Sequence, residues 1–316
     1  MYAFGAKPIY RGVMSQHRHT PSPGERDHHD HSHAHSHDGV DDTGPLEDLL
    51  DLDGEVLADA WDSALDRTVA ALTADRGVAP TRLHVVDLGA GTGTGSLGLA
   101  RRLPTAEVVA VDVSEPSLAR LAAAAAARGV GDRVRPLVAD LDSGWPALFD
   151  VDLTWASMSL HHLADPVRVL SGLREHTRSG GVVAVWEFDE PLRFLPDDLG
   201  VGRSGLEDRM LDVLAGEHAT SVPLIGSPWP ALLADAGWTV VGQHEVVVDE
   251  PSPTHPLAGR YARAWFDRLA HGLDGRLDAD DAVALAALLD DTGPHALLAR
   301  ADLHLRGTRT LTIARR

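Results

Sequence analysis

The sequence predicts a doubly wound α/β domain, and three observations support this prediction. Short Val-rich runs that are apolar on both faces alternate with helical stretches between residues 83 and 188. Runs of this kind are typical of parallel strands that helices cover on both sides. The first run ends in Asp87, and Gly89, Gly91 and Gly93 follow at once. Such a turn belongs at the carboxyl end of a first strand, where open sheets bind ligands.

The composition is that of a globular protein with one large domain or two small ones, since 44% of its 316 residues are apolar. No apolar run approaches the roughly 20 residues that span a bilayer, and no signal peptide is apparent, so we expect a cytoplasmic protein. The absence of cysteine excludes disulfides and thiolate chemistry. A formal charge of −19 favours a small-molecule partner over nucleic acid or a membrane. A homodimer is compatible with the sequence.

The first 45 residues differ in composition from the rest of the chain. They are polar and rich in Pro, Gly, Asp and His, so we expect them to be disordered. In the stretch DHHDHSHAHSHD, four histidines would share one face of an extended segment, namely His31, His33, His35 and His37. These imidazoles either chelate Zn, Ni or Cu or belong to a solvated tail with incidental metal affinity. No metal site is expected in the remaining chain, and Met14 is an alternative start.

From Leu46 onward the apolar residues fall at helical spacing, and a helical cap is expected over residues 46–80. A sheet follows, with strands expected at 83–88, 107–113, 133–140, 151–157 and 181–188. The helices expected between these strands include 115–129 and 165–181, and a glycine pair stops the second of them.

The remaining chain is expected to complete the sheet around an insertion. A helix and a long strand close a core of residues 81–250, a largely helical insertion covers 251–302, and residues 303–316 form a last strand. Because the insertion connects the last two strands, we expect it to cap the substrate site at the carboxyl edge of the sheet. Arg260 and Arg263 lie at the sides of its apolar stripe, where they face either an acidic substrate or solvent.

The spacing within the glycine turn separates two kinds of nucleotide site. A dinucleotide fold requires G-x-G-x-x-G directly after the strand, but the sixth residue counted from Gly89 is Thr94. Gly93, Gly95 and Gly98 match the pattern, yet they lie too deep in the expected helix to hold a pyrophosphate. Gly95 is expected inside that helix, where an alanine would be neutral or slightly stabilising.

The stretch VVDLGAGTG resembles the first motif of class I S-adenosylmethionine-dependent methyltransferases. Further motifs of that family follow in order as VVAVDVS, LVADLDS, VDLTWASMSLHHLADP and LREHTRSGGVVAVWE. The resemblance implies a Rossmann-like, seven-stranded sheet and S-adenosylmethionine as the cofactor. Asp112 would bind the ribose, Val113 would lie against the adenine, and Asp140 would take the adenine amino group. The full set of implied cofactor residues is Asp87, Gly89, Ala90, Gly91, Asp112, Val113, Asp140, Leu141 and Ser157.

Methyl transfer is a direct in-line displacement, and an acceptor that carries a proton also needs a base. The candidates at the ends of the fourth and fifth strands are His161, His162, Glu187 and Asp189, and we select His162. Alternatively, both histidines pack against or cap the following helix. Three tryptophans are candidates for the pocket wall, of which one or two are expected to touch ligand: Trp61, Trp155 and Trp186.

The sequence is therefore interpreted as a small-molecule methyltransferase similar to the enzymes of ubiquinone and menaquinone biosynthesis, with an oxygen or nitrogen acceptor. Two other classes stay open. One is a His-rich metal-handling or sensor protein with a nucleotide-binding domain, and the other is an NAD(P)-dependent oxidoreductase.

Overall fold

A computed structural model describes residues 44–74, 82–222, 224–251 and 255–316 of the chain. The predicted His-rich tail, with His31, His33, His35 and His37, lies outside the described residues, as does the end of the predicted helical cap. No helix in the described part is both long enough and apolar enough to cross a membrane.

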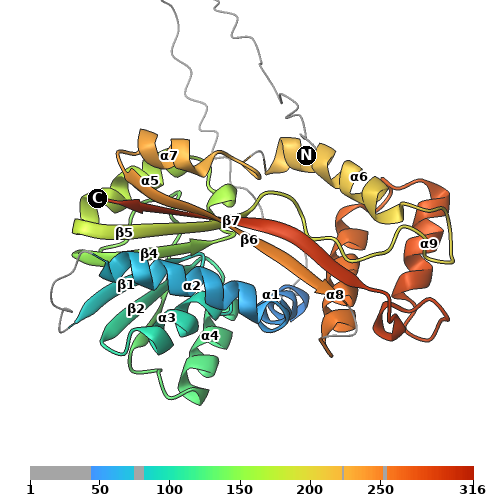
Figure 1. The fold of residues 1–316 in the computed structure, drawn as a ribbon, viewed down its shortest axis with the longest axis horizontal. Helices are drawn as coiled ribbons and strands as arrows, with labels where there is room; N and C mark the ends of the chain where they lie inside the picture. Colours follow the sequence, from blue (N-terminus) through green and yellow to red (C-terminus); the bar gives the residue numbers. More distant parts are fainter. Residues whose placement is uncertain (1–43, 75–81, 223, 252–254) are drawn as a thin grey trace, which may run out of the picture. The chain divides into compact units, whose positions relative to one another are not determined.

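The centre of the fold is a seven-stranded sheet with the order β3-β2-β1-β4-β5-β7-β6 (Figure 1). The first five strands along the chain are parallel, whereas β7 runs antiparallel to both β5 and β6. This arrangement confirms the predicted doubly wound, seven-stranded sheet. The strands are β1 (Leu83–Leu88), β2 (Ala106–Asp112), β3 (Val134–Val138), β4 (Val151–Ser157), β5 (Thr177–Phe188), β6 (Thr239–Pro251) and β7 (His304–Arg315).

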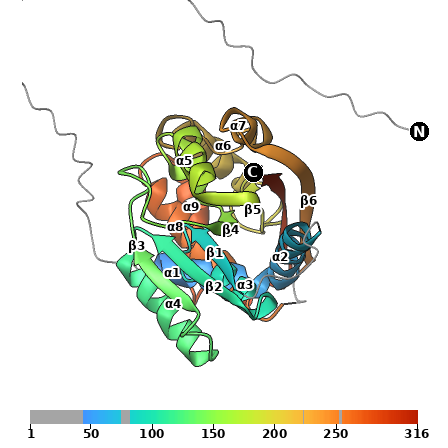
Figure 2. The ribbon, with the colours of Figure 1, turned by 90° about the vertical axis from the view of Figure 1, so that its left-hand side faces the viewer.

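Helices cover both faces of the sheet, as Figure 2 shows. Successive strand residues point to opposite faces, so Val85 and Trp155 join one apolar cluster while Val86 and Ala156 join the other. On the first face pack α2 (Ala58–Thr73), α3 (Thr94–Arg102) and α4 (Glu115–Ala127), and on the second α5 (Pro166–His176) and α7 (Trp229–Asp235). This burial on both faces explains why the parallel strands read as continuous apolar runs.

The remaining helices lie beyond the carboxyl ends of the parallel strands (Figure 1). They are α1 (Gly44–Val56), α6 (Leu206–Ser221), α8 (Ala258–Gly272) and α9 (Ala279–Leu289), with short 3-10 helices η1 (Leu160–His162) and η2 (Leu297–Ala299). In sequence, α8 and α9 stand between β6 and β7, and α1 packs against α8. Two helices that are about 200 residues apart in the sequence therefore meet over the edge where open sheets bind ligands.

One predicted boundary is wrong. The helix expected over residues 165–181 ends at His176, and β5 begins at Thr177. The register between β4 and β5 passes from Val151 opposite Thr177 to Leu153 opposite Val182, so the glycine pair lies in an irregular part of the strand. Glycines allow the backbone to bend at such a point, which their position after a helical pattern cannot reveal.

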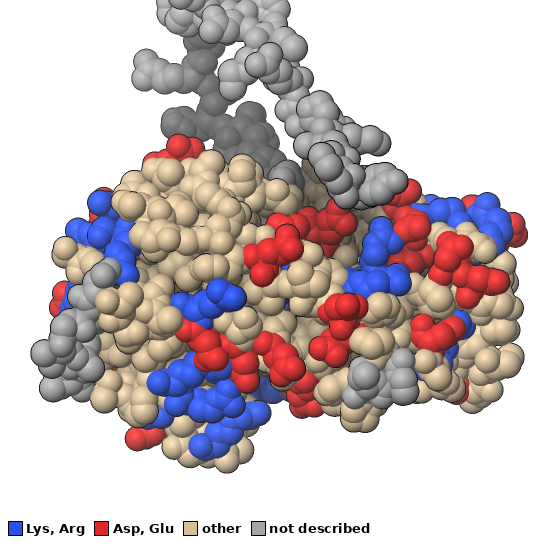
Figure 3. Space-filling model, in the orientation of Figure 1, with Lys and Arg blue, Asp and Glu red and all other residues tan. Residues whose placement is uncertain are grey.

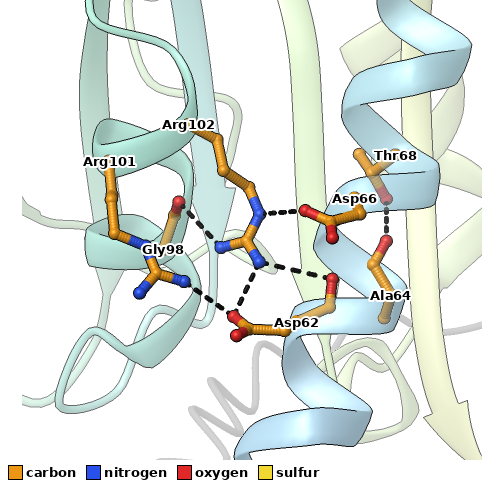
Figure 4. A network of polar contacts seen from close by, with 7 residues as sticks. All are labelled: Asp62, Ala64, Asp66, Thr68, Gly98, Arg101 and Arg102. Carbon is orange, nitrogen blue, oxygen red and sulfur yellow. Dashed lines mark hydrogen bonds and ion pairs between the residues drawn. The ribbon is translucent and has the colours of Figure 1, made fainter.

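An ion-pair network fastens α2 to α3, as Figure 4 shows. Arg102 donates to the carboxylate of Asp66 at 2.6 Å and to that of Asp62 at 2.6 Å, and its guanidinium also reaches the carbonyl of Gly98 at 3.3 Å. Arg101 donates to Asp62 at 2.7 Å. Hydrogen bonds from Arg102, together with the nearby positive charges, hold the pKa of Asp62 below its usual range. The helix preceding the sheet is thereby fixed to the helix that follows the glycine turn.

Charges of both signs are interspersed on the face drawn in Figure 3. Basic residues of α3 and α4 stand next to acidic residues of α1 and α2: Arg120 lies 2.6 Å from Asp51, and Arg101 lies 2.7 Å from Asp62. Exposed pairs of this kind contribute little to stability, in contrast to the contacts of Arg102, whose side chain is 12% exposed.

Candidate functional site

The glycine turn follows β1, as predicted, and its glycines have a left-handed backbone. Gly89, Gly91 and Gly93 have φ values of +65°, +51° and +98°. A Cβ on Gly89 would lie 2.3 Å from the Cβ of Ser159, and one on Gly93 would lie 2.5 Å from the Cγ of Leu121. Two of the three glycines are therefore required by neighbouring side chains as well as by φ, a requirement that the sequence alone did not reveal.

Gly91 occupies the middle of the turn and is bound to the end of β2. Its N–H donates to Oδ2 of Asp112 at 2.8 Å, while the N–H of Ser114 donates to Oδ1 at 2.9 Å. The nearest atom to a Cβ on Gly91 would be Cδ1 of Leu50 on α1, at 3.0 Å. The turn, the acidic residue and the covering helix are thus in direct contact.

The residues assigned to the adenine line the same edge of the sheet. Val113 is 66% exposed and directly follows Asp112 at the end of β2. Asp140 lies just after β3 and accepts hydrogen bonds from the Ser143 hydroxyl at 2.6 Å and the Asp142 N–H at 2.9 Å. The Ser143 bond is the main cause of the lowered pKa of Asp140. Leu141 is buried in the second apolar cluster.

Asp87 is buried at the end of β1, and its Oδ2 accepts a hydrogen bond from the Ser96 hydroxyl at 2.7 Å. Burial raises the pKa of Asp87 to about 7, although the Ser96 bond opposes the rise; the nearby charge of Asp112 raises it further. Ala90 is buried in the first apolar cluster. A carboxyl group that gains and loses its proton near neutral pH therefore lies directly beneath the glycine turn.

The two candidate histidines differ sharply in environment. His161 is buried, and its Nδ1 lies 2.6 Å from Oε2 of Glu187, which is also buried. The other oxygen of Glu187 accepts the N–H groups of Ser159 at 3.1 Å and Leu160 at 3.0 Å. Glu187 therefore fixes both the η1 backbone and the His161 ring.

His162, the base selected from the sequence, is exposed. Neighbouring groups still remove enough water from its ring to lower its pKa to about 4, and the charges of His161, Arg268 and His218 act in the same direction. The role of His162 stays a prediction. Asp189, a further candidate, accepts a hydrogen bond from the Thr310 hydroxyl at 2.8 Å.

The three tryptophans pack against one another on the first face of the sheet. The Trp61 and Trp186 ring centroids lie 4.7 Å apart in an edge-to-face arrangement, and Trp155 lies 6.0 Å from Trp186. Of the two arginines at the sides of the α8 apolar stripe, Arg263 pairs with Asp267 and Asp291 at 2.9 and 3.0 Å.

Sequence reasoning missed a buried cluster next to these rings. Arg309 of β7 pairs with Asp53 of α1, 256 residues away, and Asp53 also accepts the Tyr261 hydroxyl at 2.6 Å and the Trp61 indole N–H at 2.9 Å. Burial alone would raise the pKa of Asp53, but the charge of Arg309 and these hydrogen bonds hold it below its usual range. No local pattern marks a pair so distant in sequence.

Neither a metal-binding cluster of three or more His, Asp or Glu residues nor a cysteine occurs in the part of the chain that the structure describes. The four histidines of the tail lie outside that part.

Residues 86–183 match the family model of a methyltransferase domain. This part of the chain is a methyltransferase domain. The match confirms the resemblance that the glycine turn and the following motifs predicted, and S-adenosylmethionine is the cofactor that the resemblance implies for it. The matched span contains the glycine turn, Asp112, Asp140 and both candidate histidines.

Two trans-aconitate 2-methyltransferases are similar in sequence. The protein from Azoarcus sp. is 37% identical over 110 residues, which are 34% of this chain and 41% of that one. The protein from Deinococcus radiodurans is 36% identical over 123 residues, 39% of this chain and 43% of its own. The chain thus spans about two fifths of the length of these relatives.

Among solved structures, the chain is similar to geranyl diphosphate C-methyltransferase from Streptomyces coelicolor A3(2), with 14% identity and a TM-score of 0.45 over 80% of this chain and 77% of that one. It is also similar to the [4+2]-cyclase SpnF, with 22% identity and a TM-score of 0.45 over 81% of each chain.

Proposed function

We propose that the protein transfers a methyl group from S-adenosylmethionine to an oxygen or nitrogen atom of a small-molecule acceptor, by direct in-line displacement. The observation that carries this proposal is the bond from the Gly91 N–H to Asp112, inside the span that matches a methyltransferase domain. It brings the glycine turn and an acidic side chain together at the carboxyl edge of β1 and β2.

The residues present fit this cofactor. Each carboxylate oxygen of Asp112 accepts one backbone N–H and keeps acceptor capacity for a ribose hydroxyl. The exposed Val113 offers an apolar surface to an adenine ring, and the carboxylate of Asp140 would accept a hydrogen bond from the adenine amino group. The Ser157 hydroxyl is buried without a hydrogen-bond partner among the described residues, at the end of β4 next to the turn. This set would hold the nucleoside and the amino acid portions of the cofactor.

The cofactor, when bound, supplies a methyl group on a positively charged sulfur, which makes that carbon electrophilic. The task of the protein is then to orient the acceptor in line and to remove its proton where it has one. His161 suits the second task because Glu187 holds its Nδ1–H and leaves Nε2 as the basic atom. The carboxylate also stabilises the positive charge that the ring gains when it takes a proton.

Calorimetry of the full chain with S-adenosylhomocysteine and with NAD tests the proposal. We expect S-adenosylhomocysteine to bind and NAD not to bind. Asp112→Ala should weaken binding by about 1.5–3 kcal/mol, or about 10- to 150-fold, because hydrogen bonds to a charged acceptor are lost.

Glu115→Ala is the matched control, since it removes the same charge from an exposed position three residues further along. Its affinity should equal that of the wild type. Binding of NAD instead, or equal affinities of the Asp112 and Glu115 variants, would refute the assignment.

A further inference from the structure

Four buried polar atoms on one face of the sheet have no hydrogen-bond partner within the described ranges: Nε1 of Trp155, Oγ of Ser157, Nε1 of Trp186 and Nε of Arg309. Ser157 pairs in register with Trp186, and Phe188, two residues after Trp186, pairs with Arg309. Because side chains alternate along a strand, all four point to the same face. They form one row across the carboxyl ends of β4 and β5 and the adjoining middle part of β7, which we call the donor row.

All four atoms of the donor row can donate a hydrogen bond. An indole nitrogen and a guanidinium nitrogen can only donate a hydrogen bond, and a serine hydroxyl can do so as well. A buried donor without a partner costs about 1–3 kcal/mol. The row therefore fits a ligand group that is rich in acceptor oxygens.

Arg309 gives the row its charge and its orientation. Its side chain is 3% exposed, and its terminal nitrogens are bound by the carboxylate of Asp53. The guanidinium carbon lies 5.1 Å from the centre of the Trp186 ring, so the two donors are neighbours. Asp53 is itself held by Tyr261 and Trp61, which leaves the Nε edge of Arg309 as the side without a described partner.

Arg309 lies at the end of the donor row that is farther from the glycine turn. In the order β1-β4-β5-β7, Arg309 stands three strands away from the turn that follows β1. Neighbouring strands lie about 4.8 Å apart, so this separation is about 14 Å. Trp155 and Ser157 stand on the strand next to β1, whereas Trp186 and Arg309 stand on β5 and β7, farther from the turn.

We propose that the methyl acceptor carries a carboxylate, which the Nε–H of Arg309 and the indole N–H of Trp186 bind. This inference rests on the proposed function and adds the substrate class to it. Binding of the carboxylate would break no hydrogen bond between these two atoms and the described residues. Asp53, Tyr261 and Trp61 come from the helices that cover the row, so those helices must admit the ligand.

Indole N–H resonances in nitrogen-15 spectra test the inference directly, with the Trp186 signal identified by Trp186→Phe. The probes are benzoate and tricarballylate, compared with the uncharged benzamide and tricarballylamide, each added with and without S-adenosylhomocysteine. We expect a carboxylate, but not its amide, to move the Trp186 signal downfield as that N–H gains an acceptor.

Arg309→Lys removes Nε while it keeps the charge, and it should weaken carboxylate binding at least tenfold without changing the affinity for S-adenosylhomocysteine. Arg306→Lys is the control, because Arg306 lies on the same strand and bonds the carbonyl of Leu195 instead. Should Arg309→Lys fail to fold, calorimetric titration of Trp186→Phe with the same acids and amides gives the same comparison, with its melting temperature as the check.

Equal responses to acids and amides, or no response of the Trp186 signal to either acid, would overturn the carboxylate inference. Failure of S-adenosylhomocysteine to bind would instead overturn the proposed function, and the carboxylate titrations without it would still be decisive for the donor row.

Discussion

Gly95 provides the sharpest test of how the glycine turn is packed. It lies in the first turn of α3, where a Cβ would stand 2.6 Å from Nε1 of Trp155 and 3.0 Å from Oδ2 of Asp87. The Trp155 ring is fully buried between Trp61 and Trp186, with centroid distances of 6.3 and 6.0 Å, and cannot move aside cheaply. Gly95→Ala should gain at most about 1 kcal/mol of helix propensity and lose about 1–3 kcal/mol to overpacking.

Gly172→Ala is the matched control. Gly172 lies inside α5, and a Cβ there would meet nothing within 4 Å, so this variant should gain about 0.5–1 kcal/mol. Urea denaturation of the two variants beside the wild type measures both changes. We expect Gly172→Ala to be the more stable by about 1–3 kcal/mol, which is the overpacking cost alone. If Gly95→Ala proved as stable as Gly172→Ala, the packing of Trp155 under α3 would be wrong.

Two further expectations concern titrating groups. Because its folded pKa of about 7 lies above its ordinary value, Asp87 contributes stability at low pH, and this contribution is lost as the pH rises from about 4 through 7. Asp87→Asn should remove this decline in the free energy of unfolding, measured by urea denaturation across the same pH range. If the free energy of unfolding of the variant fell with pH as it does in the wild type, the assignment of Asp87 as a buried acid would be contradicted. Glu187→Gln should remove the preference of His161 for one tautomer. Nitrogen-15 spectra should show the proton on Nδ1 in the wild type and a mixture of tautomers in the variant. A proton on Nε2 in the wild type would contradict the pairing of His161 with Glu187.

The strands and the glycine turn could be predicted because their signals are local. An apolar run ending in Asp87 and followed by glycines needs only a few neighbouring residues to specify a strand and a turn. Asp112 lies next to Gly91 because the ends of adjacent parallel strands meet at one edge of the sheet, and its role toward the ribose stays a prediction.

Side-chain contacts between distant segments could not be predicted. The expectation that Ala at position 95 would be neutral or slightly stabilising considered helix propensity alone, whereas a Cβ at that position would lie 2.6 Å from Nε1 of Trp155 on β4. The buried pair of Asp53 and Arg309 joins the first described helix to the last strand, and each residue alone looks like an ordinary charged surface position. His161 and His162 are neighbours in sequence, so only the position of Glu187 on β5 separates their environments.

Substitution of Ser157, a member of the donor row, should affect stability and cofactor binding in opposite directions. The Ser157 hydroxyl is buried without a partner among the residues described, so Ser157→Ala removes a desolvated group and should leave the free energy of unfolding unchanged or raise it by about 1 kcal/mol. Ser96→Ala is the counterpart, since that hydroxyl donates to Asp87 at 2.7 Å, and its loss should destabilise the protein by about 1 kcal/mol or more. Calorimetry should show weaker S-adenosylhomocysteine binding for Ser157→Ala despite its stability. If Ser157→Ala instead loses as much stability as Ser96→Ala, the Ser157 hydroxyl has a hydrogen-bond partner within the protein. It is then not available to bind a ligand.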